Sequence, residues 1–328
     1  MKKKNKRKLL IITPVDHLDG FLDNTKKNFQ IIKYFKNPSK NDVINNIKDA
    51  NYIFTNPNMS KFKINDEIIN AGKKLKCICT ASTGTNHIDI NYAIKKNIKI
   101  LSLKKHKKIL EKIPSTAELA FTLMMTSLRN IIAASKSVTK YQWSYLEFIG
   151  EQLKDKKIGV LGFGRLGKIF ANYCLKFNAQ VYFYDPYKKN SNKNIIKYKN
   201  LIKFLKSLDI LSIHIHLNET TKNFLNKNLF QHMKKNILII NTSRGEVINE
   251  NDLIKFMRSN KNSKFAADVI SHELGNLSNS QLIKYYKKNT ERVLLTPHLG
   301  GSTFQAQKIA YFISLENLIK FDKKNNQI

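Results

Sequence analysis

A glycine-rich turn between an apolar strand and a helix constrains this chain more than any other stretch. The segment KIGVLGFGRLGKIF places an apolar run, 158–161, directly before Gly162, Gly164 and Gly167. In such a unit the first glycine permits the tight turn, the second lets backbone approach a pyrophosphate, and the third lets the helix pack on the strand. The start of the helix also offers unpaired N–H groups to phosphate. An ordinary strand-to-helix turn can carry the same glycines, so the flanking sequence must distinguish a dinucleotide-binding turn from an ordinary one.

The next predicted strand, VYFYD, ends in Asp185. A carboxylate at this position accepts hydrogen bonds from the adenosine ribose of a dinucleotide and repels a 2′-phosphate. The glycine turn together with Asp185 therefore favours NAD over NADP as the cofactor. Lys188 and Lys189 lie nearby and weaken the exclusion of NADP.

Short apolar runs alternate with amphipathic stretches of helical length along the whole chain, which predicts an α/β fold with parallel sheets and helices on both faces. We expect helices at 42–49, 116–128, 166–177 and 251–257 and an exposed loop in the Lys- and Asn-rich segment 188–200. The predicted strands are 9–12, 52–54, 77–80, 98–101, 158–161, 181–184, 210–213, 237–240, 265–267 and 293–295. Because 328 residues exceed a comfortable single core, and half the chain precedes the glycine turn, we expect two domains.

The net charge of +34 would by itself suggest a nucleic acid or an anionic membrane as partner. The charge is nearly all lysine, however, and it is spread along the chain without a basic block interleaved with aromatic residues. We therefore expect no specific nucleic-acid binding. The basic first residues are followed by too short an apolar run for a signal peptide, and no run approaches the ~18 residues of a membrane span.

The three cysteines, Cys77, Cys79 and Cys174, lack the spacing of a metal site. They are expected to be core thiols, and no metal site is predicted. Free thiols of this kind fit a reducing cytoplasm.

Arginine is rare in this chain, with six among 58 basic residues, yet Arg244 comes four residues after the end of the apolar run 237–240. Other polar groups follow neighbouring predicted strands: Asp268 and Glu273 in FAADVISHE, and His298 in VLLTPHLGGST. Groups at the carboxyl ends of parallel strands converge on one edge of the sheet. An arginine grips a carboxylate as a planar fork, and a histidine beside a carboxylate exchanges a proton. Most histidines are structural, and we assign that role to His87, His214, His216 and His272.

The order of these motifs resembles the D-isomer-specific 2-hydroxyacid dehydrogenase family, which includes D-3-phosphoglycerate dehydrogenases. The similar segments run from about residue 75 to 310 and include ASTGTNHIDI, STAELAFTLMMTSLRN, GVLGFGRLG, LDILSIHIHLNETT, MKKNILIINTSRGEVINENDL, AADVISHE and LTPHLGGST. The sequence differs from the common family pattern at His216 and Leu274, where proline is usual, and in a longer segment 102–115. These changes remove no catalytic group, but the longer segment leaves the substrate open.

The resemblance implies roles for individual residues. Arg244, Glu273 and His298 take the catalytic positions, and the backbone N–H groups of Thr83 and Gly84 take the place that holds the substrate carboxylate. Besides Gly162, Gly164 and Gly167, the positions assigned to the cofactor are Arg165, Leu166, Asp185, Thr242, Ser243, Asp268, Gly300 and Gly301.

The resemblance also implies a fold of two Rossmann-like doubly wound domains with the active site in the cleft between them. We expect a discontinuous substrate-binding domain, 1–104 with 299–328, an NAD-binding domain, 105–298, and a homodimer formed through the NAD-binding domain. The expected activity is NAD-dependent interconversion of a D-2-hydroxy acid and its 2-keto acid, with 3-phosphoglycerate as one possible type of substrate. The alternatives are an NAD(H)-sensing regulatory protein of the same fold and, from the charge alone, a nucleic-acid-binding protein.

Overall fold

The computed structural model describes residues 6–57, 62–189 and 192–325. The chain divides into two compact units: the first is Met1–Ile113 with Thr303–Ile328, and the second is Pro114–Ser302. These bounds differ from the predicted domain bounds for local reasons. His106 stays with the first unit through a 2.9 Å contact between its Nε2 and Nδ2 of Asn317, and Gly300 stays with the second through its N–H bond to Asp268.

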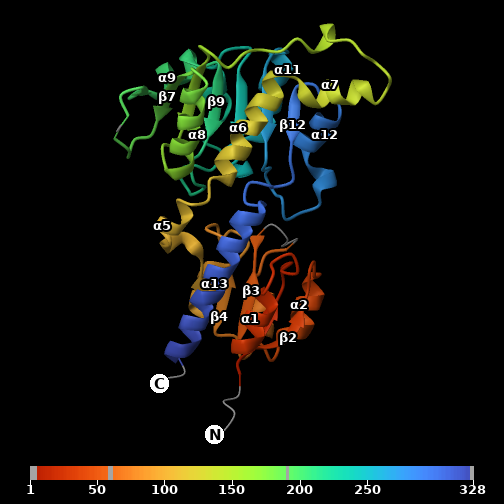
Figure 1. Ribbon diagram of the computed structural model, residues 1–328, viewed down its shortest axis with the longest axis vertical. Coiled ribbons are helices and arrows are strands. Elements are labelled where there is room, and N and C mark those ends of the chain that lie inside the picture. The colour runs from red at the N-terminus through yellow and green to blue at the C-terminus, as the bar shows by residue number, and fades with distance from the viewer. Residues whose placement is uncertain (1–5, 58–61, 190–191, 326–328) are drawn as a thin grey trace. The chain divides into compact units, whose positions relative to one another are not determined.

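The first unit is a five-stranded parallel sheet in the order β2-β1-β3-β4-β5. Its helices cover both faces, because alternate residues of each strand enter different cores: Leu9 and Ile11 pack on one face, and Leu10 and Ile12 on the other. The strands are β1 (Lys8–Ile11), β2 (Gln30–Tyr34), β3 (Tyr52–Thr55), β4 (Cys77–Thr80) and β5 (Lys99–Leu101). The helices are α1 (Phe21–Asn28), α2 (Lys40–Asn46), α3 (Asp66–Ala71), α4 (Ile90–Lys95), η2 (Leu103–Lys105), α5 (Lys107–Leu110) and α13 (Phe304–Asn325) (Figure 1).

The second unit is a seven-stranded parallel sheet in the order β12-β11-β10-β9-β6-β7-β8. Its strands are β6 (Lys157–Leu161), β7 (Gln180–Tyr184), β8 (Ile195–Lys197), β9 (Ile210–Ile213), β10 (Leu238–Asn241), β11 (Lys264–Ala267) and β12 (Val293–Leu295). The strand order reverses beside β6, which pairs with β7 on one side and β9 on the other. Ligands of doubly wound sheets bind at such a reversal, beyond the carboxyl ends of the strands.

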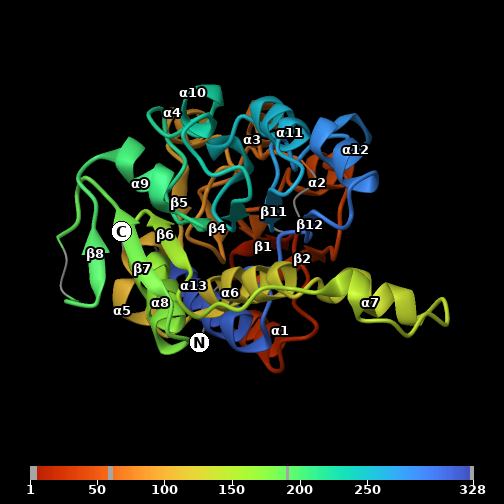
Figure 2. The ribbon, with the colours of Figure 1, turned by 90° about the horizontal axis from the view of Figure 1, so that it is seen from above.

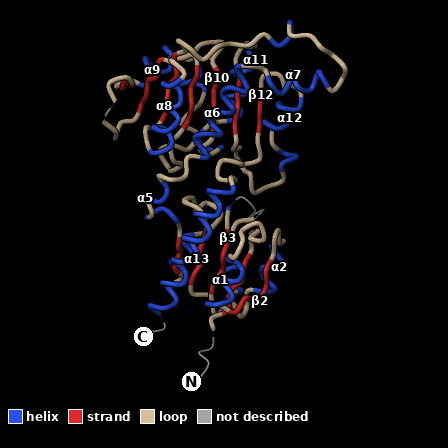
Figure 3. The backbone as a smooth tube through the Cα atoms, viewed as in Figure 1, coloured by secondary structure: helices blue, strands red, loops and turns tan. Residues whose placement is uncertain are grey.

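Helices cover both faces of this second sheet. They are α6 (Ser115–Leu128), α7 (Ile131–Val138), η3 (Leu146–Phe148), α8 (Arg165–Lys176), α9 (Leu201–Ser207), α10 (Lys227–Phe230), η4 (Gly245–Val247), α11 (Glu250–Ser259), η5 (Leu277–Asn279) and α12 (Gln281–Lys287). One core contains residues of α6 and α8, and the other contains residues of α9, α11 and α12. Figure 3 shows the strands of each sheet in red between blue helices. The predicted α/β fold with two parallel sheets is confirmed.

Each of the predicted strands overlaps an observed one, but two observed strands were not predicted. The segment 188–200, predicted to be an exposed loop, contains β8, so that prediction was wrong for Ile195–Lys197. Ile195 is buried and pairs with Val181 of β7, whereas Ile196 is exposed. The other strand, β2, pairs only with β1 at the edge of its sheet and has no fully buried residue.

All three cysteines are free and buried, as predicted. Cys77 and Cys79 enter the same core from one face of β4, and burial raises the pKa of both thiols. In the part of the chain that the structure describes, no helix is long and apolar enough to cross a membrane.

Candidate active site

The glycine turn lies between β6 and α8, and the structure requires glycine at two of its three positions, Gly162 and Gly167. Gly162 has a φ of 93°, and a Cβ there would lie 2.8 Å from the carbonyl carbon of His214. A Cβ on Gly167 would lie 2.2 Å from the carbonyl oxygen of Gly162. Gly164 differs, because nothing lies within 4 Å of its missing Cβ. The space beside Gly164 is open, and its assigned contact with a pyrophosphate stays a prediction.

The N-terminus of α8 is suited to an anion. Gly164 is its N-cap residue and makes no side-chain capping bond, and the start of a helix of 12 residues carries a positive partial charge that favours an anion. Arg165 and Leu166 form the first turn and are half-buried. This arrangement fits a dinucleotide pyrophosphate.

Asp185 joins the end of β7 to the glycine turn. Its Oδ2 accepts the N–H of Phe163 at 2.9 Å, and its Oδ1 accepts the N–H of Tyr187 at 2.9 Å. The carboxylate is half-buried and therefore lies beside the turn in a fixed orientation. Each oxygen retains a lone pair with which it can accept from a ribose hydroxyl.

The loop after β10 is organised by the side chain of Asn241. Its Oδ1 accepts from the N–H and Oγ of Ser243 at 3.0 and 2.9 Å, and its Nδ2 donates to the carbonyl of Arg244 at 2.9 Å. The hydroxyl of Thr242 is buried and has no hydrogen-bond partner within the described residues. A buried hydroxyl without a partner is unfavourable, so Thr242 fits a position that a ligand completes.

Asp268 follows β11 and holds the loop after β12. Its carboxylate accepts from Oγ1 of Thr296 at 2.6 Å and from the N–H groups of Leu299 and Gly300, both at 2.7 Å. Burial raises the pKa of Asp268, although these hydrogen bonds oppose the rise. The carbonyl of Gly300 accepts from Thr116 at 2.9 Å, whereas Gly301 has nothing within 4 Å of its missing Cβ. Asp268 therefore orders the segment that carries His298, and its assigned contact with the cofactor stays a prediction.

The structure brings two of the three predicted catalytic residues together. Nδ1 of His298 lies 2.7 Å from Oε2 of Glu273, and the two side chains are 25% and 31% exposed. The other oxygen of Glu273 accepts the N–H of Ile270 at 3.2 Å, which fixes the carboxylate. His298 has a φ of 56°, an uncommon conformation for a residue with a side chain, and its N–H donates to the carbonyl of Asp268 at 3.0 Å. Backbone hydrogen bonds therefore fix both the Glu273 carboxylate and the main chain of His298.

Arg244 lies on a neighbouring loop but is not bonded to the pair. Among the described residues its guanidinium donates to one acceptor, the carbonyl of Ser243, at 2.6 Å. The loops of Arg244 and Glu273 pack closely, because a Cβ on Gly245 would lie 1.9 Å from the carbonyl carbon of Ile270. Most donors of the half-buried guanidinium thus remain for a ligand.

Glu250 was not identified from the sequence, although it supports the loop that carries Glu273. It begins α11, and its Oε1 accepts the N–H of Ser271 at 2.6 Å. Burial raises the pKa of the Glu250 carboxyl. An acidic residue at the start of a predicted helix was its only signal, and such residues are common.

Thr83 and Gly84 belong to the first unit and follow β4. Within the described residues, the N–H groups of both donate no hydrogen bond, and Thr83 is exposed. The described contacts do not join them to Arg244, Glu273 or His298. Their assignment to the substrate carboxylate stays a prediction.

Comparisons with known proteins agree with these features. A family model described as D-isomer specific 2-hydroxyacid dehydrogenase, NAD binding domain, matches residues 121–300. The chain is 32% identical to the hydroxypyruvate reductase of Thermotoga maritima over 80% of this chain and 82% of that protein. It is 28% identical to the D-3-phosphoglycerate dehydrogenase of Archaeoglobus fulgidus over 96% of this chain but 57% of that protein.

A solved structure shows the same fold. The D-lactate dehydrogenase of Aquifex aeolicus, crystallised with NAD and lactic acid, superimposes with a TM-score of 0.82 at 24% identity, covering 97% of this chain and 96% of that one. The family match covers the glycine turn, Asp185 and all three predicted catalytic residues. The chain therefore belongs to the D-isomer specific 2-hydroxyacid dehydrogenase family and is an NAD-dependent oxidoreductase.

Proposed function

We propose that this protein interconverts a small D-2-hydroxy acid of the 3-phosphoglycerate kind and its 2-keto acid. The observation that carries the proposal is the 2.7 Å contact between Nδ1 of His298 and Oε2 of Glu273. NAD supplies or accepts the hydride when it is bound. The protein has to supply the proton and stabilise the charge on the substrate oxygen.

His298 is the general acid and base in this proposal. Because Nδ1 faces Glu273, Nε2 is the nitrogen that exchanges a proton with the substrate oxygen. The Glu273 carboxylate favours the protonated imidazole and fixes its orientation. A protein that only senses NAD(H) has no use for this pair, so its presence supports turnover.

Arg244 and the turn at Thr83 and Gly84 bind the substrate in this proposal. The free donors of Arg244 polarise the carbonyl and stabilise the negative charge that develops on its oxygen during reduction. The N–H groups of Thr83 and Gly84 hold the carboxylate without adding a charged side chain. Uncharged backbone donors bind an anion well when, as among the described residues here, they have no other partner.

Activity can be tested by following NADH absorbance with a panel of 2-keto acids: glyoxylate, pyruvate, hydroxypyruvate and 3-phosphohydroxypyruvate. We expect turnover, with the phosphorylated acid giving the highest kcat/KM. A higher kcat/KM for an unphosphorylated acid would contradict the proposed substrate type but not the proposed reaction. Binding of NADH without oxidation by any of these acids would favour the sensing alternative.

We further propose that the protein is a homodimer formed through the second unit. Residues 131–149, the arm, extend away from the rest of that unit (Figure 2). They expose large apolar side chains, with Tyr141 100%, Trp143 90% and Tyr145 78% exposed. Exposed apolar surface of this kind marks an interaction site, and a second copy can cover both arms in one closed, symmetric interface.

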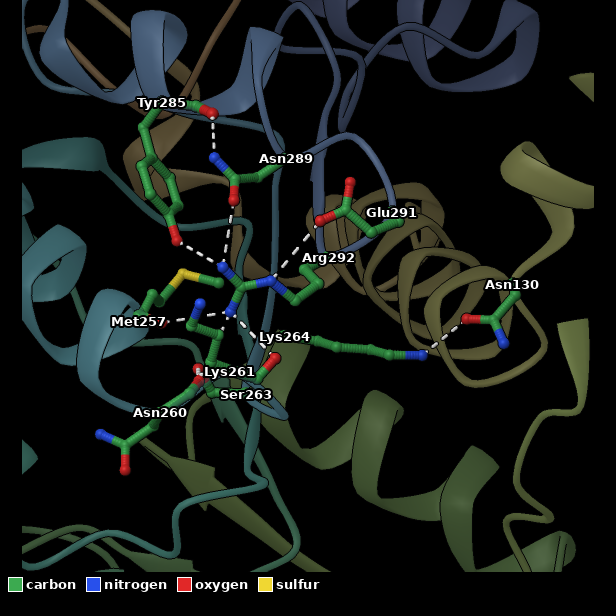
Figure 4. A network of polar contacts seen from close by, with 10 residues as sticks. All are labelled: Asn130, Met257, Asn260, Lys261, Ser263, Lys264, Tyr285, Asn289, Glu291 and Arg292. Atoms are coloured by element: carbon green, nitrogen blue, oxygen red, sulfur yellow. Dashed lines mark hydrogen bonds and ion pairs between the residues drawn. The ribbon is translucent and has the colours of Figure 1, made fainter. Parts of the chain in front are cut away.

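The base of the arm is fastened to its own unit. The N–H of Glu151 donates to the carbonyl of Leu128 at 3.0 Å, and Nδ2 of Asn130 donates to the carbonyl of Ile149 at 3.3 Å. Lys264 of β11 donates to Oδ1 of Asn130 at 2.7 Å (Figure 4). The arm is thus presented on a fixed base, which lowers the entropic cost of docking.

Sedimentation measurements test the dimer. We expect a dimer for the wild type and a monomer for Trp143→Glu, because a buried charge opposes the interface. Ile94→Glu, which alters a residue 63% exposed in the first unit, is the matched control and should remain dimeric. A monomeric wild type at micromolar concentration would contradict this proposal.

A further inference from the structure

A chain of polar side chains lies behind the Thr83–Gly84 turn of the first unit. Oγ1 of Thr80 is 3.1 Å from Nε2 of His87 and 2.9 Å from Oγ of Ser82. Oγ of Ser82 donates to the carbonyl of Gly84 at 2.7 Å. Thr80 and His87 are 0% and 1% exposed, so water does not compete for the bond between them.

The direction of each hydrogen bond in this chain follows from counting protons. A hydroxyl has one proton to donate. Ser82 donates its proton to Gly84, so it accepts from Thr80. Thr80 has then donated its own proton and must accept from His87. The chain therefore runs from His87 Nε2–H through Thr80 and Ser82 to the carbonyl of Gly84, and it requires the proton on Nε2 of His87.

This chain restrains the peptide groups that carry the N–H donors of Thr83 and Gly84. The side chain of Ser82 and the carbonyl of Gly84 lie on either side of those peptide groups, and the bond between them limits their rotation. A second bond, from the N–H of Leu103 to the carbonyl of Ser82 at 2.9 Å, fixes the start of the turn. The donors of the turn are thereby aimed before any ligand arrives, which lowers the cost of binding.

We infer that His87 is a positioning residue, which acts through Thr80 and Ser82 to hold the Thr83–Gly84 turn in the orientation that binds the substrate carboxylate. The inference rests on the proposed role of that turn. His87 touches neither substrate nor cofactor in this account. This positioning role replaces the purely structural role that the sequence suggested for His87.

Kinetics of matched variants test the inference. Thr80→Val keeps the shape of the side chain and removes the hydroxyl, so the chain is broken. We expect KM for the 2-keto acid to rise about tenfold, the usual worth of a hydrogen bond to an ionised group, with kcat within about twofold. Affinity for NADH should not change, and Thr80→Ser should restore KM.

Ser314→Ala is the control for a loss of packing in the same core. Its hydroxyl is buried and donates to the carbonyl of Thr80 at 3.3 Å, but it lies outside the chain of side chains. Its KM should equal that of the wild type. If Ser314→Ala raised KM as much as Thr80→Val, or if Thr80→Val left KM unchanged, the positioning role would be wrong.

Comparing the 2-keto acid with its methyl ester separates this inference from the proposed function. We expect the wild type to prefer the acid, and Thr80→Val to raise KM for the acid but not for the ester. A wild type that reduced the ester as well as the acid would refute the carboxylate role of the turn, and the inference would fall with it. A wild type that prefers the acid, with KM raised equally for both compounds in Thr80→Val, would refute the inference alone.

The tautomer of His87 provides a test that does not depend on activity. In ¹⁵N spectra of the imidazole nitrogens, with the His87 signals assigned by their loss in His87→Gln, we expect the proton on Nε2. A proton on Nδ1 alone would reverse the direction of the chain and overturn the inference.

Discussion

The seven-stranded sheet has an amino edge, where its strands begin, and a carboxyl edge, where its strands end. An arginine lies at each, and the two have opposite surroundings. At the amino edge, directly before β12, the guanidinium of Arg292 is surrounded by acceptors (Figure 4). Nη1 donates to the carbonyls of Met257 and Lys261 at 3.1 and 3.0 Å, and Nη2 donates to Tyr285 at 2.7 Å and Asn289 at 3.1 Å. The arginine there satisfies the carbonyls at the C-terminal end of α11 and joins that helix to α12.

At the carboxyl edge, Arg244 has one acceptor among the described residues, the carbonyl of Ser243. The side chains are of the same type and lie in the same unit, but only Arg244 keeps donors for a ligand. If Arg244 has its proposed role, the number of guanidinium donors left without partners among the described residues separates a functional arginine from a structural one. Charge and residue type do not separate the two.

Replacing the proton donor at the carboxyl edge should have the largest effect. We expect His298→Ala to lower kcat for keto-acid reduction by roughly 10²–10⁴-fold, the usual contribution of a positioned general acid. Steady-state rates at saturating NADH measure the loss. His232→Ala, in the turn after α10, is the control and should retain the wild-type rate. Full activity in His298→Ala would require the mechanism to be abandoned.

Glu273→Gln should reduce activity less than His298→Ala. The amide still accepts a hydrogen bond from Nδ1 of His298 but carries no negative charge to balance the imidazolium. We expect about a tenfold loss of kcat for reduction, measured at saturating NADH. Glu291→Gln, which removes the carboxylate beside Arg292 at the other edge, should keep the wild-type rate. A Glu273→Gln variant with wild-type activity would refute the role of Glu273.

Removing the charge of Asp185 should weaken the choice between cofactors. The wild type is expected to prefer NADH to NADPH. In Asp185→Asn the preference should fall on the order of tenfold, because repulsion of the 2′-phosphate is lost. Fluorescence titration with both cofactors measures the ratio. Asp209→Asn, at the amino edge, where Asp209 pairs with Lys234 at 2.7 Å, should not change it. Equal affinity of the wild type for the two cofactors would contradict this assignment.

The smallest expected effect concerns Glu250, behind the catalytic loop. Burial raises the pKa of its carboxyl in the folded protein, so folding favours the protonated form. The wild type therefore loses stability as pH rises from the unfolded pKa through the raised folded one. Glu250→Gln keeps an acceptor for Ser271 and avoids this loss. Its melting temperature should exceed that of the wild type by less than about 3 °C, more at pH 8 than at pH 5. An advantage that shrank with rising pH would contradict the sign.

Strands were predicted well where burial is complete on both faces. The run 158–161 has no polar side chain and 210–213 has only the buried Ser212, and all residues of both lie in a parallel sheet covered on both sides. The two missed strands, β2 and β8, lack this signal; each lies at the edge of its sheet and has one neighbouring strand, as do β5 and β12, which were predicted. In β2 no residue is fully buried, and in β8 only Ile195 is, so both resemble loops in sequence.

Candidate site residues could be named from the sequence where a strong strand precedes them. Arg244, Glu273 and His298 each come soon after an apolar run, and two of them meet in the structure. The role of His87 could not be predicted, because it depends on where the hydroxyl of Thr80 points after β4 is formed. The arm had a signal that was not used, namely three aromatic residues within 141–145 that lie outside any predicted core element.

The most direct test of the contrast between the two edges is to replace each arginine by lysine and to measure kcat/KM and melting temperature. Arg244→Lys should lower kcat/KM by about 10²–10³-fold, because an ammonium cannot reproduce the planar fork, and should keep the melting temperature of the wild type. Arg292→Lys should lower the melting temperature by several degrees, roughly the worth of lost hydrogen bonds in a unit of this size. Its kcat/KM per folded molecule should stay within about twofold of the wild type. The account would be contradicted if Arg244→Lys were fully active, or if Arg292→Lys lost activity while it kept its stability.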